Sequence, residues 1–144
     1  MCLDTLRYAA AAGLWAEALE ADPGLGQDRK SWHLFMGAYT AALAATGRGQ
    51  GDPLPNNDEK VRLRGQALVW LKADLAAWAK VIDSSPAVRT RAFYVVESWR
   101  HHPDLASVRE PEALAKFPDA ERKQWQAHWA RVDALFKRAW KKSP

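Results

Sequence analysis

The segment from residue 97 to residue 104, Glu-Ser-Trp-Arg-His-His-Pro-Asp, carries the side chains of this chain that are best suited to chemistry. Glu97 and His101 are four residues apart and therefore share one face of a helix. Asp104 can fold under them once Pro103 has ended that helix. An imidazole and two carboxylates can bind a divalent metal such as zinc or manganese. Because a bound metal turns water into a nucleophile, this hypothesis makes Glu97, His101 and Asp104 the metal-ligating and catalytic residues of a small hydrolase of activated esters or phosphoesters.

The same segment has a second interpretation that needs no metal. A histidine in the last turn of a helix interacts favourably with the C-terminal end of the helix dipole. Glu97 and His101 are then an ordinary exposed pair that contributes little to stability. His33 and His128 lie on other predicted helices and could converge on His101, and the sequence leaves this open.

Composition excludes several other classes of protein. The chain has 144 residues and one cysteine, so Cys2 can form no intramolecular disulfide and no cysteine pair can hold zinc. Its longest apolar stretch, residues 8–16, is much shorter than the roughly 20 residues of a membrane-spanning helix. The sequence Met-Cys-Leu-Asp at its start lacks the basic leader of a signal peptide. We therefore expect a cytoplasmic protein without a membrane partner.

Charge is uneven along the chain. Residues 1–57 hold four Lys or Arg against six Asp or Glu, whereas residues 58–144 hold seventeen against eleven. The basic residues near the end surround an aromatic side chain, in the order Lys137, Arg138, Trp140, Lys141 and Lys142. Such a cluster can bind nucleic acid, but cations in a final helical turn are also favoured by the helix dipole. A nucleic-acid partner is therefore not the leading expectation.

Hydrophobic residues recur at helical spacing and strand patterns are almost absent, which predicts an all-α protein. Long helices are expected over residues 4–21, 29–46, 58–82, 86–102 and 119–141, with a short turn over 112–116. The third has an apolar stripe of Val61, Leu68, Leu71, Leu75, Trp78 and Ile82. Ser85 and Pro86 are typical of the N-cap and first position of the fourth. Its expected buried face consists of Val88, Ala92, Val95, Val96 and Trp99, and that of the last helix consists of Trp125, Trp129, Val132, Phe136 and either Ala139 or Trp140.

These elements predict a single helical domain over residues 1–144, built as an antiparallel bundle of about five long helices. Residues 1–50 would form a helix pair, and residues 58–144 would supply the helices that cap it.

Five residues of the first helix match the spacing of a known repeat: Tyr8, Ala11, Trp15, Ala18 and Pro23. They resemble the second helix of a tetratricopeptide repeat, in which small residues let helices approach closely and aromatic residues fill the gaps between them. The match extends over about one repeat, so a free-standing repeat array is not expected.

A second resemblance covers essentially the whole chain. Its motifs are RLRGQALVWLKADLAAW at residues 62–78, PDLASVR at 103–109, ALAKFP at 113–118 and the pair Glu121-Arg122. They resemble the region that closes many large planctomycete-type serine/threonine protein kinases, after their tetratricopeptide repeats. No kinase chemistry carries over, because the chain has no glycine-rich phosphate loop and no His-Arg-Asp or Asp-Phe-Gly motif. The resemblance implies a terminal repeat, a capping bundle of helices and contacts with other proteins.

The leading expectation is thus a non-catalytic, tetratricopeptide-like module without a cofactor. It would bind a protein partner through exposed aromatic residues and its basic second half. The metal-dependent hydrolase is the alternative, and the oligomeric state stays open.

Overall fold

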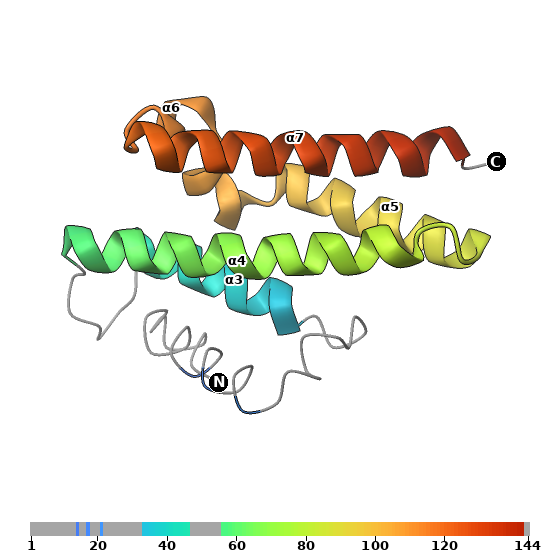
Figure 1. Ribbon diagram of the computed structural model, residues 1–144, viewed down its shortest axis with the longest axis horizontal. Coiled ribbons are helices and arrows are strands. Elements are labelled where there is room, and N and C mark those ends of the chain that lie inside the picture. Colours follow the sequence, from blue (N-terminus) through green and yellow to red (C-terminus); the bar gives the residue numbers. More distant parts are fainter. Residues whose placement is uncertain (1–13, 15–16, 18–20, 22–32, 47–55, 143–144) are drawn as a thin grey trace. The chain divides into compact units, whose positions relative to one another are not determined.

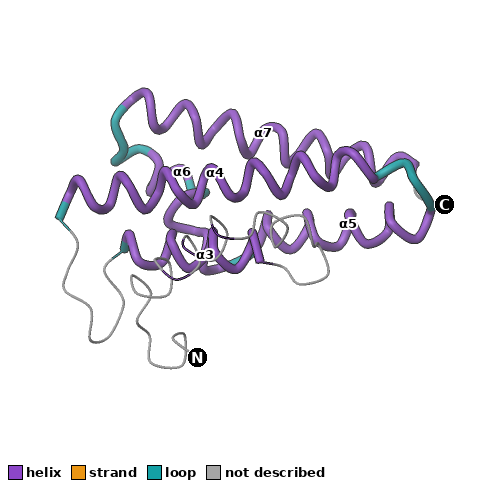
Figure 2. Tube along the Cα trace, turned by 60° about the horizontal axis from the view of Figure 1, so that its bottom comes forward, coloured by secondary structure: helices purple, strands orange, loops and turns teal. Residues whose placement is uncertain are grey.

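The computed structural model of this chain describes residues 14, 17, 21, 33–46 and 56–142. Their helices are α3 (His33–Ala45), α4 (Asn57–Val81), α5 (Pro86–His101), α6 (Pro111–Leu114) and α7 (Asp119–Lys142), with a 3-10 helix, η2 (Pro103–Val108), between α5 and α6 (Figure 1). No strand occurs among the described residues, and short loops join the helices from α4 onward (Figure 2). The predicted all-α helical bundle is confirmed.

The chain divides into two compact units, residues 1–74 and residues 75–144, and the boundary between them falls inside α4. The predicted division into a helix pair over 1–50 and capping helices over 58–144 stays a prediction. The expected first helix and the tetratricopeptide-like motif lie outside the described residues, except that Leu14, Glu17 and Ala21 are helical. None of the helices described combines the length and apolar character needed to cross a membrane.

The described helices of the first unit bury small and aliphatic residues. In α3 the buried residues include Ala38, Ala41, Ala42, Leu43, Ala44 and Ala45. In α4 the apolar stripe is buried from Leu63 onward, and Leu68 and Leu71 follow it as predicted. Val61 is a correction, because it is 47% exposed. It shares its side of the helix with Gly65 and Val69, which lie four and eight residues further on and are also exposed. The buried stripe therefore begins half a turn later than predicted.

Gly65 offers a direct route to a more stable chain. It lies in the interior of α4 on an exposed face, and a Cβ added there would meet no atom within 4 Å. Glycine in a helix interior costs about 0.5–1 kcal/mol relative to alanine. We expect Gly65→Ala to raise the free energy of unfolding in urea by about this amount. A lower free energy of unfolding in the variant would show that this position needs the absence of a side chain.

The second unit starts with the turn that leads into α5. Ser85 caps this helix as predicted, because its hydroxyl accepts a hydrogen bond of 3.1 Å from the backbone N–H of Val88, and Pro86 occupies the first turn. The expected buried face is confirmed for Ala92, Val95, Val96 and Trp99, whereas Val88 is half-buried. α5 packs alongside α7 (Figure 1). Phe93 in the middle of α5 contacts Trp140 near the end of α7, whereas Arg100 near the end of α5 pairs with Asp133 earlier in α7, so the two helices run antiparallel.

The connection between α5 and α7 contains more structure than the sequence predicted. α5 ends before Pro103 as expected, but residues 103–108 then form η2, and the expected short turn over 112–116 is α6 over 111–114. The 3-10 helix begins because the Nδ1 atom of His102 accepts a hydrogen bond from the N–H of Asp104. Pro103 therefore both ends one helix and opens the next, since the first turn of a helix does not need its N–H.

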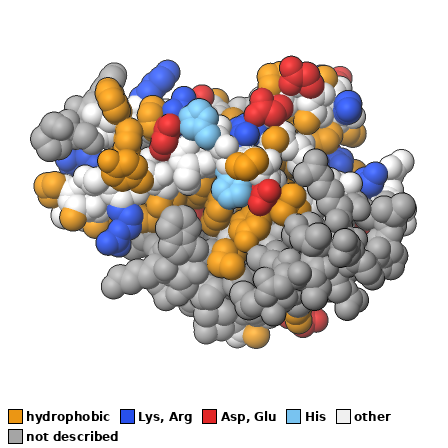
Figure 3. All heavy atoms as spheres, turned by 180° about the vertical axis from the view of Figure 1, so that it is seen from behind, with side chains coloured by type: hydrophobic (Ala, Val, Ile, Leu, Met, Phe, Trp, Pro, Cys, Tyr) orange, Lys and Arg blue, Asp and Glu red, His pale blue; other side chains and the backbone are white. Residues whose placement is uncertain are grey.

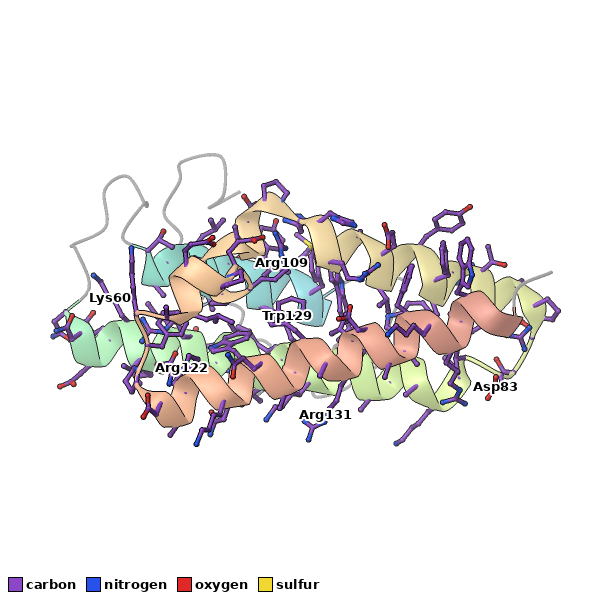
Figure 4. All side chains as sticks on the ribbon, turned by 90° about the horizontal axis from the view of Figure 1, so that it is seen from above. Lys60, Asp83, Arg109, Arg122, Trp129 and Arg131 are labelled. Carbon is purple, nitrogen blue, oxygen red and sulfur yellow. The ribbon has the colours of Figure 1, made fainter. Side chains whose placement is uncertain are left out.

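Two long side chains hold this connection in place. The Arg109 guanidinium donates hydrogen bonds to the carbonyl oxygens of Trp99, at 3.0 Å, and His102, at 2.8 Å. The indole N–H of Trp129 on α7 donates to the carbonyl oxygen of Val108 at 2.8 Å. Figure 4 shows Arg109 and Trp129 close together. These bonds fix the end of α5 and the end of η2 through atoms far apart in sequence.

Candidate functional site

The structure brings together two of the three predicted site residues. The Nε2 atom of His101 lies 3.1 Å from Oε1 of Glu97, and the His101 side chain is 69% exposed. Asp104 lies in the first turn of η2, after the chain has left α5. Across the residues that the structure describes, no three His, Cys, Asp or Glu side chains form a group that could hold a metal. Glu97 and His101 are thus a helical i, i+4 pair, and Asp104 does not complete a ligand set with them.

Glu97 also takes part in a network that joins α5 to α7. Its Oε2 atom accepts a hydrogen bond of 3.0 Å from Nη1 of Arg100, and Nε of Arg100 donates to Oδ1 of Asp133 at 2.9 Å. Arg100 therefore binds one carboxylate from each helix. This arrangement gives Glu97 a structural role that the sequence interpretation did not include.

The structure places His128 in a different environment from His101. His128 is fully buried in α7, and its ring contacts Trp125 and Trp129 edge to face, with centroid distances of 6.2 and 5.0 Å. His33 begins α3 in the other unit, and its side chain lies outside the described residues. His101 is exposed, whereas His128 packs among aromatic rings. Within the described residues, the two histidines do not belong to a common group of metal ligands.

A stack of aromatic rings lies between α5 and α7. The ring centroid of Phe136 is 5.0 Å from that of Phe93 and 4.1 Å from the Arg100 guanidinium carbon. Phe93 and Arg100 are seven residues apart, or about 10 Å along α5, so the Phe136 ring fits between them. Trp140, one turn after Phe136, contacts Phe93 at 5.6 Å. The order along the stack is therefore Arg100, Phe136, Phe93 and Trp140, with the two helices alternating.

The stack supports two exposed aromatic residues. Tyr94 is 66% exposed and Trp140 is 64% exposed. The Tyr94 ring meets Phe93 edge to face, with 5.4 Å between centroids and 82° between planes. We call Phe93, Tyr94, Phe136 and Trp140 the α5/α7 aromatic patch. Single exposed apolar residues are common, but an exposed group of adjacent aromatic rings is typical of a contact surface.

Positive charge accompanies this patch. Residues 84–96 and 134–144 contain six cations and no acid; the cations are Arg89, Arg91, Lys137, Arg138, Lys141 and Lys142. Asp83, just before α5, forms ion pairs with Arg89 and Arg138, which ties the start of α5 to the end of α7. Figure 4 shows Asp83 at that end of α7. In Figure 3, hydrophobic side chains stand among those of Lys and Arg at the left, the side where α5 begins.

Sequence reasoning found only part of this patch. It left open whether Ala139 or Trp140 completes the buried face of the last helix, and the structure buries Ala139 and exposes Trp140. It placed Phe136 on the buried face, and the structure shows this residue half-buried. It assigned no role to Phe93 or Tyr94. The adjacent pair Phe93-Tyr94 was the available signal, because two large aromatic residues lie side by side in this helix outside its predicted buried face.

The chain was compared with protein families, curated proteins and solved structures. No family model, curated protein or solved structure matches this chain. The resemblance to the closing region of planctomycete-type kinases therefore rests on the motif residues alone.

Proposed function

We propose that this chain is a protein-protein interaction module and that the α5/α7 aromatic patch is its contact surface. The observation that carries the proposal is the exposure of Tyr94 and Trp140 next to the stacked rings of Phe93 and Phe136. Tyrosine, tryptophan and arginine are the residues that most often dominate the binding energy of protein interfaces. The patch offers two exposed aromatic residues, and Arg100 lies against Phe136 at the other end of the ring stack.

The packing of the patch favours binding because it reduces the entropy lost on association. Trp140 contacts Phe93, Phe93 contacts Phe136, and Phe136 contacts Arg100, which is itself bound to Asp133. A side chain that is already restrained before binding loses less rotamer freedom when a partner arrives. The resemblance to a tetratricopeptide-containing kinase region supports the same function.

Site-specific photo-crosslinking tests the proposal. A photoreactive phenylalanine analogue in place of Tyr94 is expected to form crosslinks to a discrete protein partner in the source cell. Trp140→Ala in the same chain should remove those crosslinks. The matched control carries the analogue at Val69, which is also exposed but lies on α4. Equal crosslinking from positions 69 and 94, or crosslinks that survive Trp140→Ala, would contradict the assignment of the patch.

The alternative function, a hydrolase centred on Glu97 and His101, has the 3.1 Å contact between these side chains as its support. His101→Ala separates the two functions. An interaction module should keep its crosslinks at Tyr94 and its stability, since exposed pairs contribute little. A hydrolase should lose at least about a hundredfold in rate on ester or phosphoester substrates, because a general base or ligand contributes that much.

A further inference from the structure

We infer that the α5/α7 aromatic patch binds an acidic segment of a partner protein that also carries apolar side chains. The inference rests on the proposed function and specifies the chemistry of the partner. It depends on where the cations of α5 and α7 lie relative to the exposed rings.

Each exposed aromatic residue has a cation three residues before it in the same helix. Arg91 precedes Tyr94 in α5, and Lys137 precedes Trp140 in α7, and both cations are exposed. Residues three apart are neighbours on a helix surface. An apolar group that packs on either ring therefore comes close to a positive charge. A partner with carboxylates next to its apolar side chains satisfies both features at once.

The acids that border the patch do not neutralise this charge. Asp83 is shared by Arg89 and Arg138, Asp133 pairs with Arg100, and Glu97, three residues after Tyr94, contacts Arg100 and His101. These ion pairs involve Arg89, Arg100 and Arg138, whereas Arg91 and Lys137 are not part of them, and α7 extends to Lys142. The positive potential near the exposed rings favours an anionic partner and speeds its association.

The state of the rings favours a peptide over a single-stranded nucleic acid. Proteins that bind single strands stack successive bases on open aromatic faces. Here Phe136 is held between Phe93 and Arg100, and Phe93 is held between Phe136 and Trp140. The faces of the two central rings are therefore engaged within the protein. Aliphatic and aromatic side chains of a peptide can pack on ring edges, so they do not need those faces.

A peptide panel tests the inference directly. The probe is a fluorescently labelled amphipathic peptide with Leu and Phe on one face and Glu on the other. Two matched peptides replace every Glu with Gln or with Lys. Fluorescence anisotropy with the full chain is expected to give the tightest binding for the Glu peptide and the weakest for the Lys peptide. Binding of the Glu peptide should weaken as salt rises, because exposed charges are screened.

Variants of the chain locate the binding. Trp140→Ala is expected to weaken the Glu peptide by about tenfold or more, the effect of an interface hot spot. Arg91→Glu and Lys137→Glu should weaken the Glu peptide and strengthen the Lys peptide. Lys123→Glu is the matched control, because it reverses an exposed charge in the first half of the same helix, and it should change neither affinity by more than about twofold.

The remaining outcomes overturn the inference in distinguishable ways. Equal binding of the three peptides, or preference for the Lys peptide, would refute an acidic partner and leave the patch as a contact surface. If no peptide binds but the crosslinks at Tyr94 still depend on the patch, the acidic partner is likewise refuted and the patch remains a contact surface. Tighter patch-dependent binding of oligothymidine or of phosphatidylserine vesicles would assign the surface to nucleic acid or to a membrane, and would overturn the proposed function as well.

Discussion

Replacing Trp125 with alanine is expected to lower the free energy of unfolding by about 3–5 kcal/mol, the usual cost of removing a large buried aromatic side chain. Trp125 is fully buried in α7, where its ring stacks with that of Trp129 and meets His128 edge to face. Alanine leaves a cavity that these neighbours cannot fill without moving. Urea unfolding followed by far-ultraviolet circular dichroism measures the loss, which should also lower the melting temperature by about 10 °C or more.

Trp140→Ala is the matched control for this prediction. It makes the same substitution in the same helix at a position that is 64% exposed, and it removes the ring contact with Phe93. We expect a loss of about 1 kcal/mol or less. A similar loss for the two variants would mean that Trp125 is less closely packed than its burial indicates.

Local sequence signals predicted the helix ends of the second unit well, because the interactions that cap a helix are short-range. Ser85 and Pro86 identify the start of α5 through one hydrogen bond and one fixed backbone angle. Pro103 identifies its end for a similar reason. The 3-10 helix that follows was missed, since it depends on the His102 ring acting as a cap, and histidine is not among the usual capping residues.

Hydrophobic periodicity predicted which side of each helix is buried, but not how far the buried stripe extends. Val61 has the right spacing to continue the stripe of α4, yet it is exposed. In α7 the spacing allowed either Ala139 or Trp140, and the structure buries Ala139 and exposes Trp140, because burial at a helix end depends on whether another element covers it. The spacing of apolar residues within one helix does not show which other helix packs against its end.

The candidate sites show the same limit. The contact between Glu97 and His101 follows from their spacing within one helix, so the sequence predicted it correctly. The position of Asp104 depends on the path of the chain after α5, and the structure places it in η2 instead. The aromatic patch depends on the register of α5 against α7, which brings Phe93 between Phe136 and Trp140. No spacing within either helix reveals that register.

Arg109 shows how one side chain can determine the path of the connection after α5. Its guanidinium reaches back to the carbonyl oxygens of Trp99 and His102, and its other nitrogens bind the Glu110 carboxylate. The last carbonyl groups of a helix have no partner within the helix and must find one elsewhere. Arginine can supply several donors from one planar group, which lysine cannot.

Arg109→Ala is therefore expected to lower the free energy of unfolding by about 2–3 kcal/mol, because hydrogen bonds from a charged donor are worth about 1.5–3 kcal/mol and the carbonyl groups of Trp99 and His102 lose the guanidinium, although the His102 carbonyl keeps its bond from the N–H of Leu105. Arg109→Lys should recover part of the loss, since one ammonium group can reach only some of the acceptors. Arg131→Ala, at an exposed position of α7, should stay within about 0.5 kcal/mol of the unchanged chain. Hydrogen exchange at the end of α5 and in η2 should accelerate in Arg109→Ala but not in Arg131→Ala. If the two variants unfold at the same urea concentration and exchange at the same rate, the carbonyl groups of Trp99 and His102 do not depend on Arg109, and the end of α5 must be held by other contacts.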